Sequence, residues 1–166
     1  AICDFGSVVG YAMIGLGCEE TGFNHSMGNP YSFQILSING KSSDQLQRDL
    51  EALRLPGLRF QKVSLSDGRG RPVVGVLVTV SDWNAWNPTE LSFHLMRLAC
   101  RYRLFNPFLS LSPAEASKFN KLVGSSAWWN ALRRDGARVD VEAFLRSWQS
   151  ADRAYQQQMR AFWLYR

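Results

Sequence analysis

The sequence predicts an α+β fold, with a small mixed sheet formed mainly by the first half of the chain and packed by helices from the second half. Two largely apolar runs before residue 81 are typical of paired strands, whereas residues 88–166 repeat apolar side chains at helical spacing. The chain has 166 residues, of which 46% are apolar and 20% are charged. Both values fit one globular domain, so we treat residues 1–166 as a single domain.

The first third of the chain is predicted to hold two strands around a polar loop. Residues 8–14 are almost continuously apolar, which favours a buried strand or a pair of short strands. A loop rich in Gly, Asn and Pro follows over residues 19–31. A short strand over residues 33–38 then ends at the turn signal Asn39-Gly40.

A helix and a β-hairpin are predicted next. Ser42 caps a helix whose apolar positions recur every three or four residues, and Pro56-Gly57 stops it. Strands over residues 58–63 and 73–80 are joined by the polar loop 66–72, whose glycines predict a flexible tip. Because the second strand is apolar almost throughout, we expect it to be central and covered on both faces.

The second half is predicted to be helical. One helix starts at Pro88, a second opens with a capping box at Ser112, and a third ends at Gly136. A last helix runs from about Asp140 to the C-terminus. Its predicted apolar face consists of Val141, Phe144, Leu145, Trp148, Tyr155, Met159 and Phe162. We expect the tryptophans of this half to be mostly core: Trp128, Trp129, Trp148 and Trp163.

Charge is unevenly distributed along the chain. Residues 1–96 carry 7 basic and 9 acidic side chains, and residues 97–166 carry 12 basic and 5 acidic ones. The basic half fits either solvated helix faces or contact with an anionic polymer. It contains no Lys/Arg run typical of a nucleic-acid arm, and we expect no nucleic-acid partner. No apolar run reaches the ~20 residues of a membrane span, so none is expected.

Cysteine and histidine positions exclude several classes of site. The three cysteines and two histidines lack paired metal-ligand spacing, so we expect no metal and no cofactor. Cys100 is predicted to be a small buried apolar side chain. His94 is predicted to lie on the flank of its helix and to pack against a neighbouring side chain. Cys3 and Cys18 can pair only if the flanking strand folds back.

A few side chains have a chemistry suited to a site. Glu19-Glu20 is an adjacent carboxylate pair, but neighbours on an extended strand point to opposite faces, so at most one lines a site. His25 lies in a loop that can either offer backbone N–H groups to a ligand or serve as a plain connector. Trp83 and Trp86 follow the central strand, where they either stack on a sugar or pack on the next helix.

The order and spacing of several segments resemble a known family, the C-terminal domain of the NamZ-type exo-β-N-acetylmuramidases, formerly a family of unknown function. The resemblance covers nearly the whole chain. The segments that carry it are Leu55–Phe60, Gly75–Asp82, Phe119–Ser125, Leu132 to Gly136, Trp148 and Arg160–Tyr165.

The resemblance also supplies candidate site residues. The family's cleft-facing motif matches at Glu19, Thr21, Gly28 and Phe33, whereas Met27 stands where the family has Arg and Ser32 where it has Pro. Loss of that Arg removes donors suited to a carboxylate, so either specificity has changed or another basic group has taken over. Our substrate-cleft candidates are Glu19, Thr21, Asn24, His25, Gly28 and Trp83.

The resemblance implies a role within a larger enzyme. Relatives carry a Rossmann-like N-terminal domain that holds the catalytic residues and removes N-acetylmuramic acid from the non-reducing ends of peptidoglycan fragments. The chain opens Ala1-Ile2-Cys3-Asp4, without an initiator Met, which also predicts a part of a longer protein. We therefore expect an accessory domain, inactive alone, partnered by that catalytic domain and a peptidoglycan sugar. By resemblance only, we expect a bacterial periplasmic or cell-surface location.

Two further functions are compatible with the sequence. A non-catalytic glycan- or protein-binding module would use exposed aromatic side chains and the basic half. A purely structural domain would instead present a large apolar interface to its neighbour.

Overall fold

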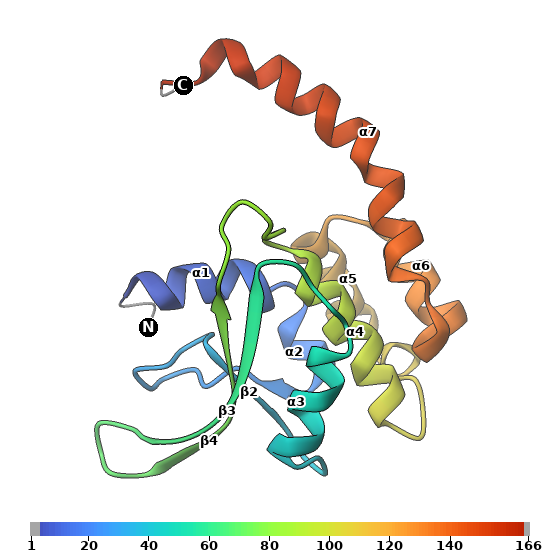
Figure 1. Ribbon diagram of the computed structural model, residues 1–166. Helices are drawn as coiled ribbons and strands as arrows, with labels where there is room; N and C mark the ends of the chain where they lie inside the picture. Colours follow the sequence, from blue (N-terminus) through green and yellow to red (C-terminus); the bar gives the residue numbers. More distant parts are fainter. Residues whose placement is uncertain (1–3, 165–166) are drawn as a thin grey trace.

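The computed structural model describes residues 4–164 and confirms the α+β class, with the strands early and most helices late in the chain (Figure 1). One four-stranded sheet has the order β1-β2-β4-β3, and the sheet that we expected to be mixed pairs antiparallel at each of its three junctions. The strands are β1 (Phe23–Asn24), β2 (Ile35–Ile38), β3 (Leu58–Ser66) and β4 (Pro72–Val80).

Helices account for most of the remaining described chain. The α-helices are α1 (Phe5–Ile14), α2 (Cys18–Thr21), α3 (Ser43–Glu51), α4 (Glu90–Tyr102), α5 (Pro113–Val123), α6 (Ser126–Asp135) and α7 (Val141–Met159). Three short 3-10 helices are η1 (Pro107–Leu109), η2 (Gly136–Arg138) and η3 (Arg160–Phe162). None of these helices is long and apolar enough to cross a membrane, a finding that covers residues 4–164.

The predicted hairpin forms the largest part of the sheet. Strands β3 and β4 pair from Leu58↔Val80 to Ser66↔Pro72, and β4 is central between β2 and β3. Val76 and Val78 are buried, but Val74 is 51% exposed and Thr79 is also exposed. The expectation that β4 is covered on both faces is therefore correct only for its middle residues.

The prediction of a strand over residues 8–14 is wrong, because this segment belongs to helix α1. Asp4 caps the helix: its Oδ1 accepts a hydrogen bond from Ser7 N at 2.8 Å. Gly10 lies so close to the next segment that an added Cβ would be 2.0 Å from the Phe33 carbonyl oxygen. A short apolar run has the same composition in a buried strand and in a buried helix, and tertiary contact decides between them.

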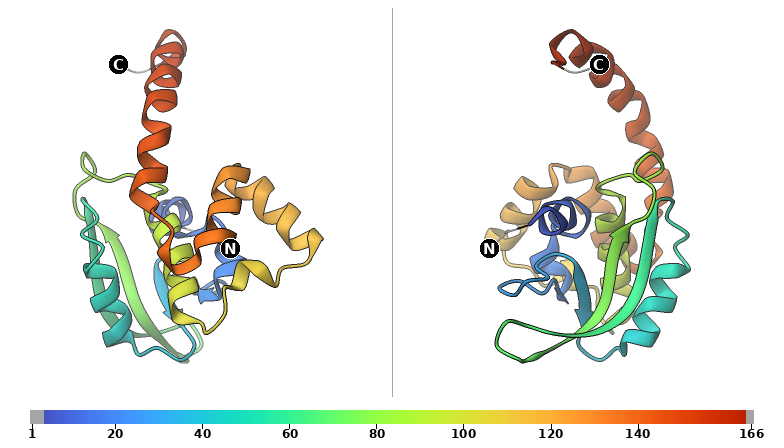
Figure 2. Two further views of the ribbon diagram at one scale, coloured as in Figure 1. Left: turned by 90° about the vertical axis from the view of Figure 1, so that its right-hand side faces the viewer. Right: turned by 60° about the vertical axis from the view of Figure 1, so that its left-hand side comes forward.

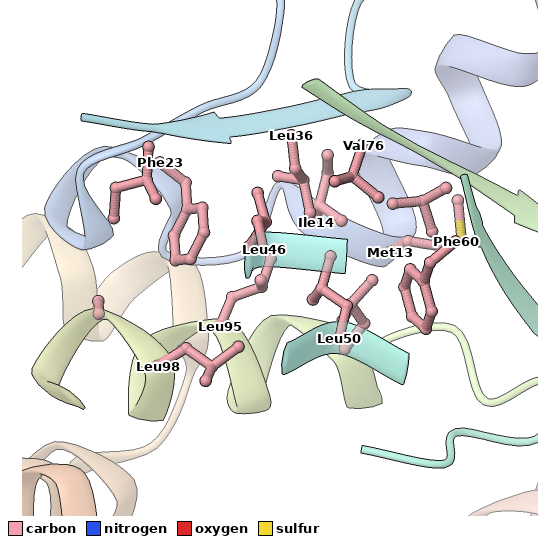
Figure 3. Close-up of a cluster of buried hydrophobic side chains, with 14 of the residues drawn as sticks. Met13, Ile14, Phe23, Leu36, Leu46, Leu50, Phe60, Val76, Leu95 and Leu98 are labelled. Atoms are coloured by element: carbon pink, nitrogen blue, oxygen red, sulfur yellow. The ribbon is translucent and has the colours of Figure 1, made fainter. Parts of the chain in front are cut away.

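Two hydrophobic clusters share helix α4. One cluster joins the sheet to α1, α3 and one side of α4, including Met13, Leu50 and Leu95 (Figure 3). The other joins the opposite side of α4 to α5, α6 and the start of α7, including Phe93 and Trp128. The predicted apolar stripe on α4 is confirmed, and the opposite side of the helix is buried as well.

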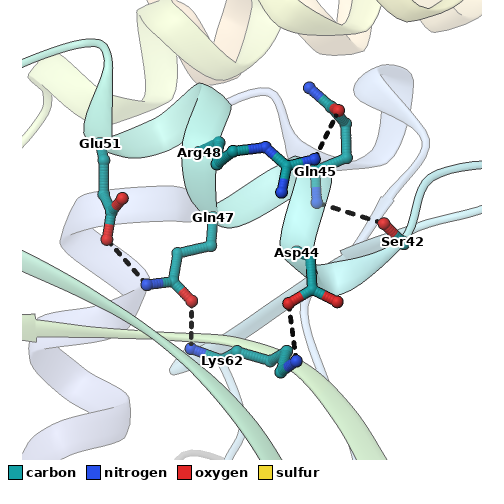
Figure 4. Close-up of polar contacts among 7 residues, drawn as sticks. All are labelled: Ser42, Asp44, Gln45, Gln47, Arg48, Glu51 and Lys62. Carbon is teal, nitrogen blue, oxygen red and sulfur yellow. Dashed lines mark hydrogen bonds and ion pairs between the residues drawn. The ribbon is translucent and has the colours of Figure 1, made fainter.

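Helix α3 is capped as predicted and is tied to the neighbouring strand by polar contacts (Figure 4). Ser42 Oγ accepts a hydrogen bond from Gln45 N at 3.2 Å. Gln47 Oε1 accepts from Lys62 N at 3.0 Å, and Lys62 Nζ pairs with Asp44 Oδ1 at 2.6 Å. The helix ends at Glu51, before the Pro56-Gly57 stop that we expected.

Helix α7 extends away from the rest of the domain (Figures 1 and 2). Its first turns pack through Val141, Phe144 and Trp148 against the second cluster. Beyond that point its predicted apolar face is not buried, since Tyr155 is 59% exposed. Trp163, which we expected in the core, is 49% exposed, so that expectation is wrong.

Candidate functional site

The two adjacent carboxylates have different surroundings. Both lie on helix α2, where Glu19 pairs with Lys118 of α5 and both side chains are more than half exposed. Glu20 is buried, and its Oε2 has no hydrogen-bond partner among the described residues. Burial raises the pKa of Glu20. The pair is thus divided between surface and interior, which does not suit two carboxyl groups acting across one glycosidic bond.

Thr21 and Asn24 shape the chain locally. Thr21 is buried, and its Oγ1 donates a hydrogen bond to the Cys18 carbonyl at 2.8 Å. Asn24 is exposed on β1, and its Oδ1 accepts from Ser26 N at 2.8 Å. The hydroxyl of Thr21 therefore faces its own helix, whereas Asn24 lies where a ligand can reach it.

His25 lies inside the domain. Its ring stacks near Phe33, with ring centroids 6.3 Å apart, and it is 5% exposed. Neither ring nitrogen has a hydrogen-bond partner within residues 4–164. Burial lowers the pKa of His25 to about 4, so the imidazole is neutral at neutral pH. The loop closes on itself, because Phe33 N donates to the His25 carbonyl at 2.8 Å.

Gly28 borders an open cavity of about 610 Å³. One wall is the loop from Gly28 to Pro30, and the other is the tip of the β3–β4 hairpin, which contributes Arg69 and Arg71. Two aspartates line it too, Asp4 at the N-cap of α1 and Asp67 in the hairpin tip. The cavity thus joins the candidate loop to a segment about forty residues later in the chain.

Asp67 organises the hairpin tip. Its Oδ1 accepts from the backbone nitrogens of Arg69 and Arg71 at 2.8 and 2.9 Å, and its Oδ2 accepts from Arg71 Nε at 2.8 Å. These donors, the Arg71 backbone N–H first, lower the pKa of Asp67. The Arg69 guanidinium makes no hydrogen bond or ion pair to the part of the chain that the structure describes. It is therefore free to meet an anion in the cavity.

Arg69 and Arg71 are not among the candidates that the sequence predicts. The loop over residues 66–72 is predicted only as a flexible hairpin tip, because its glycines carry no specific signal for a site. The signal that it lacked is the position of the tip beside Gly28, which depends on how the whole sheet twists.

Trp83 is 54% exposed directly after β4. Its ring lies 5.8 Å from Phe5 of α1 and 5.4 Å from Trp86, measured between centroids, and Trp86 packs against the first cluster. Trp83 therefore packs against α1, and about half of its side chain stays accessible. The start of α1 connects the two candidate regions, because Asp4 lines the Gly28 cavity and Phe5 contacts Trp83.

Other predictions concern metal and thiol chemistry. Residues 4–164 contain no group of three or more His, Cys, Asp or Glu side chains that could hold a metal ion. Cys100 is buried in the second cluster, as predicted, and burial raises its pKa to about 11. His94 is also buried on α4, as predicted. The proposed Cys3–Cys18 pair involves a residue outside the described part of the chain.

Fold and cavity together define the class of this protein: an α+β domain with one antiparallel sheet and an arginine-lined cavity between a hairpin tip and a polar loop. More narrowly, the chain belongs to the family described as "Exo-beta-N-acetylmuramidase NamZ, C-terminal", whose model matches residues 9–165. The family resemblance is confirmed, and the domain is related to peptidoglycan glycosidases at the family level.

A solved structure has the same fold. It is the crystal structure of a DUF1343 family protein from Bacteroides fragilis NCTC 9343, with a TM-score of 0.76 and 20% sequence identity. The match covers 95% of this chain and 42% of that chain, so this chain spans less than half the length of its structural relative. No curated protein matches this chain.

Proposed function

We propose that this domain forms one wall of the substrate cleft of a muramidase-type glycosidase whose catalytic residues belong to a separate N-terminal domain. Family membership supports a link to peptidoglycan fragments. The length of the solved relative, of which this fold is 42%, is consistent with a further domain in the parent protein. On the resemblance alone, we also propose a periplasmic or cell-surface location in bacteria.

The Gly28 cavity is the observation that carries this proposal. Of the cleft candidates, Gly28 is the one that lines it, and the cavity brings Gly28 next to Arg69 and Arg71. The family's cleft arginine is replaced here by Met27, and guanidinium groups from the hairpin tip offer the same carboxylate-binding chemistry. Arg69, which has no acidic partner in residues 4–164, is the better placed of the two to bind the lactyl carboxylate of a muramic acid residue.

In this proposal the domain binds and orients substrate and performs no bond cleavage. Glu19 is held by Lys118, and Glu20 is buried and unpaired. Glycoside hydrolysis needs two carboxyl groups that flank the scissile bond, and these two do not converge. We therefore expect no muramic acid release by this chain alone, and detectable release by the chain alone would contradict the proposal.

A binding experiment tests the role of the hairpin tip. We would compare binding of a muramic acid glycoside and of its N-acetylglucosamine counterpart, which lacks the carboxylate, by calorimetric titration. Arg69→Gln should weaken the acidic sugar about tenfold and leave the neutral one unchanged, because only the former offers an ion pair. Arg59→Gln, an equal charge change at the other end of β3, is the matched control. Equal affinity of wild type and Arg69→Gln for the acidic sugar would overturn this assignment.

A partner-binding role is a second candidate, because the far part of the chain leaves large apolar side chains uncovered. These are Tyr155, Phe162, Trp163 and Leu164, each about half exposed or more. In a two-domain parent, they would contact the N-terminal domain. Light scattering and cross-linking of this chain with a separately produced N-terminal domain would test this role. Association lost on Phe162→Ala would support it, and unchanged association would argue against it.

A further inference from the structure

A second arginine-lined cavity lies between α4 and η2 and shares no lining residue with the Gly28 cavity. It has a volume of about 380 Å³ and is lined by Arg97 and Arg101 of α4 and by Arg138 of η2. Apolar side chains complete it, among them Leu53 and Val139. No acidic residue is among those that line it.

The three arginines come together because of how η2 packs. Arg97 and Arg101 are four residues apart on α4, so they share one face of that helix. The 3-10 helix η2, which follows the Gly136 end of α6, packs directly against α4 and brings Arg138 beside them. Like charges in this arrangement repel one another, so the isolated fold gains nothing electrostatic from the cluster itself.

The carboxylates nearby are largely engaged by other groups. Asp49 accepts from Tyr102 Oη at 2.7 Å and from Gln45 Nε2 at 3.1 Å, whereas its closest approach to Arg101 is 4.0 Å. The Arg101 guanidinium is therefore only weakly neutralised.

Arg138 and Arg97 differ in whether a carboxylate neutralises them. Asp135 accepts two hydrogen bonds from its neighbour Arg134, at 2.9 and 2.6 Å, and Arg138 has no hydrogen bond or ion pair to residues 4–164. Only Arg97 has a closer acidic partner, since its Nη1 lies 3.3 Å from Glu142 Oε2, and its Nη2 contacts His94 Nδ1 at 3.0 Å. Arg138 is therefore the cavity arginine without an ion pair in residues 4–164, and the Arg101 guanidinium lies 4.0 Å from its carboxylate partner.

We propose that this cavity binds the phosphate group of a small phosphomonoester. A phosphate carries up to two negative charges and three terminal oxygens, which matches several guanidinium groups. A carboxylate carries one charge and is already saturated by one bidentate arginine. The cavity is larger than inorganic phosphate alone, and Leu53 and Val139 provide an apolar surface for the rest of the ligand.

Titration of the 166-residue chain with phenyl phosphate, inorganic phosphate and benzoate tests the proposal. We expect saturable binding of phenyl phosphate with a Kd of about 1 mM or tighter, inorganic phosphate somewhat weaker, and benzoate at least about tenfold weaker. Two-dimensional NMR of the arginine Nε–Hε groups should show shifts at Arg101 and Arg138. Benzoate binding as tightly as phenyl phosphate, or no saturation up to about 10 mM phenyl phosphate, would overturn the proposal.

Variants separate this site from general electrostatics. Arg138→Gln and Arg101→Gln should each weaken phenyl phosphate about tenfold; both side chains are exposed, so the fold should be retained, as circular dichroism can verify. Arg153→Gln, on the exposed far part of α7, makes the same charge change and should have no effect. Equal weakening in all three variants would mean that only net charge matters and would contradict a specific site.

Discussion

Helices α4 and α7 have similar amphipathic patterns, yet only α4 is enclosed. Nearly every residue of α4 from Leu91 to Cys100 is buried, because the helix lies between the two hydrophobic clusters. In α7, which is six residues longer, Val141 alone is buried. The comparison teaches that apolar periodicity predicts a helix and its apolar face, whereas burial of that face depends on what the rest of the protein supplies.

The largest expected effect comes from the enclosed helix. Phe93 contacts Trp128, Phe144 and Trp148 with ring centroids 5.1 to 5.6 Å apart. Phe93→Ala should lower the free energy of unfolding by about 3–5 kcal/mol, because it leaves a cavity in the second cluster. Urea denaturation would measure this loss. Phe105→Ala, at a position 84% exposed, is the control and should change stability by less than about 0.5 kcal/mol. A loss below about 1 kcal/mol for Phe93→Ala would show that α4 is less tightly enclosed than described.

A pH dependence comes from the same enclosure. Burial, with a smaller contribution from Arg97, lowers the pKa of His94 from 6.5 to about 4. The unfolded chain binds this proton more readily than the folded one. The contribution of His94 to the free energy of unfolding is therefore fully present above pH 6.5 and is lost as the pH falls toward 4. His94→Gln should therefore reduce the drop in unfolding free energy between pH 7.5 and pH 4.5 by about 2 kcal/mol.

The test compares the pH dependence of the unfolding free energy in the wild type and in the variant, so a change in absolute stability does not affect it. Glu90, close to His94, has a pKa raised by burial and so opposes the effect over part of the range. His25→Gln, at the second buried histidine, should reduce the drop similarly. A pH slope in His94→Gln identical to that of the wild type would contradict a buried neutral imidazole, whatever the absolute stability of the variant.

The smallest effect is expected at the exposed end of the chain, beyond helix α7. Phe162 is 73% exposed, so Phe162→Ala should change the unfolding free energy of this chain by less than about 0.5 kcal/mol. Thermal and urea unfolding would measure the change, with Phe105→Ala again as the exposed reference. A loss above about 1.5 kcal/mol would mean that the end of the chain packs against the domain, and the contrast with α4 would disappear.

Local signals in the sequence were sufficient for much of the fold. Ser112 and Glu115 form the predicted capping box, and Gly136 ends α6 as expected. The β3–β4 hairpin also follows the predicted pattern, because alternating side chains and a Gly-rich turn act within one short segment. These features depend on residues that are close together in the sequence, so one sequence is enough to predict them.

The errors arise where distant segments decide the outcome. The apolar run of α1 predicts a strand because it lacks a polar face, whereas the close packing of Gly10 against Phe33 is visible only in the folded chain. The candidate site was only partly predictable for the same reason. The loop at Gly28 was selected, but the neighbouring Arg69 was not, since their proximity depends on the twist of the sheet. The helical spacing of Trp163 predicts a core position, but spacing does not show whether another segment covers the side chain.

Because α4 contributes to both hydrophobic clusters, the sheet half and the helical half of this domain should melt as one cooperative unit. A substitution that loosens the packing around Phe93 would then be felt at the sheet, since both clusters share the same helix backbone. A ligand bound at either arginine-lined cavity would then stabilise the whole domain against unfolding.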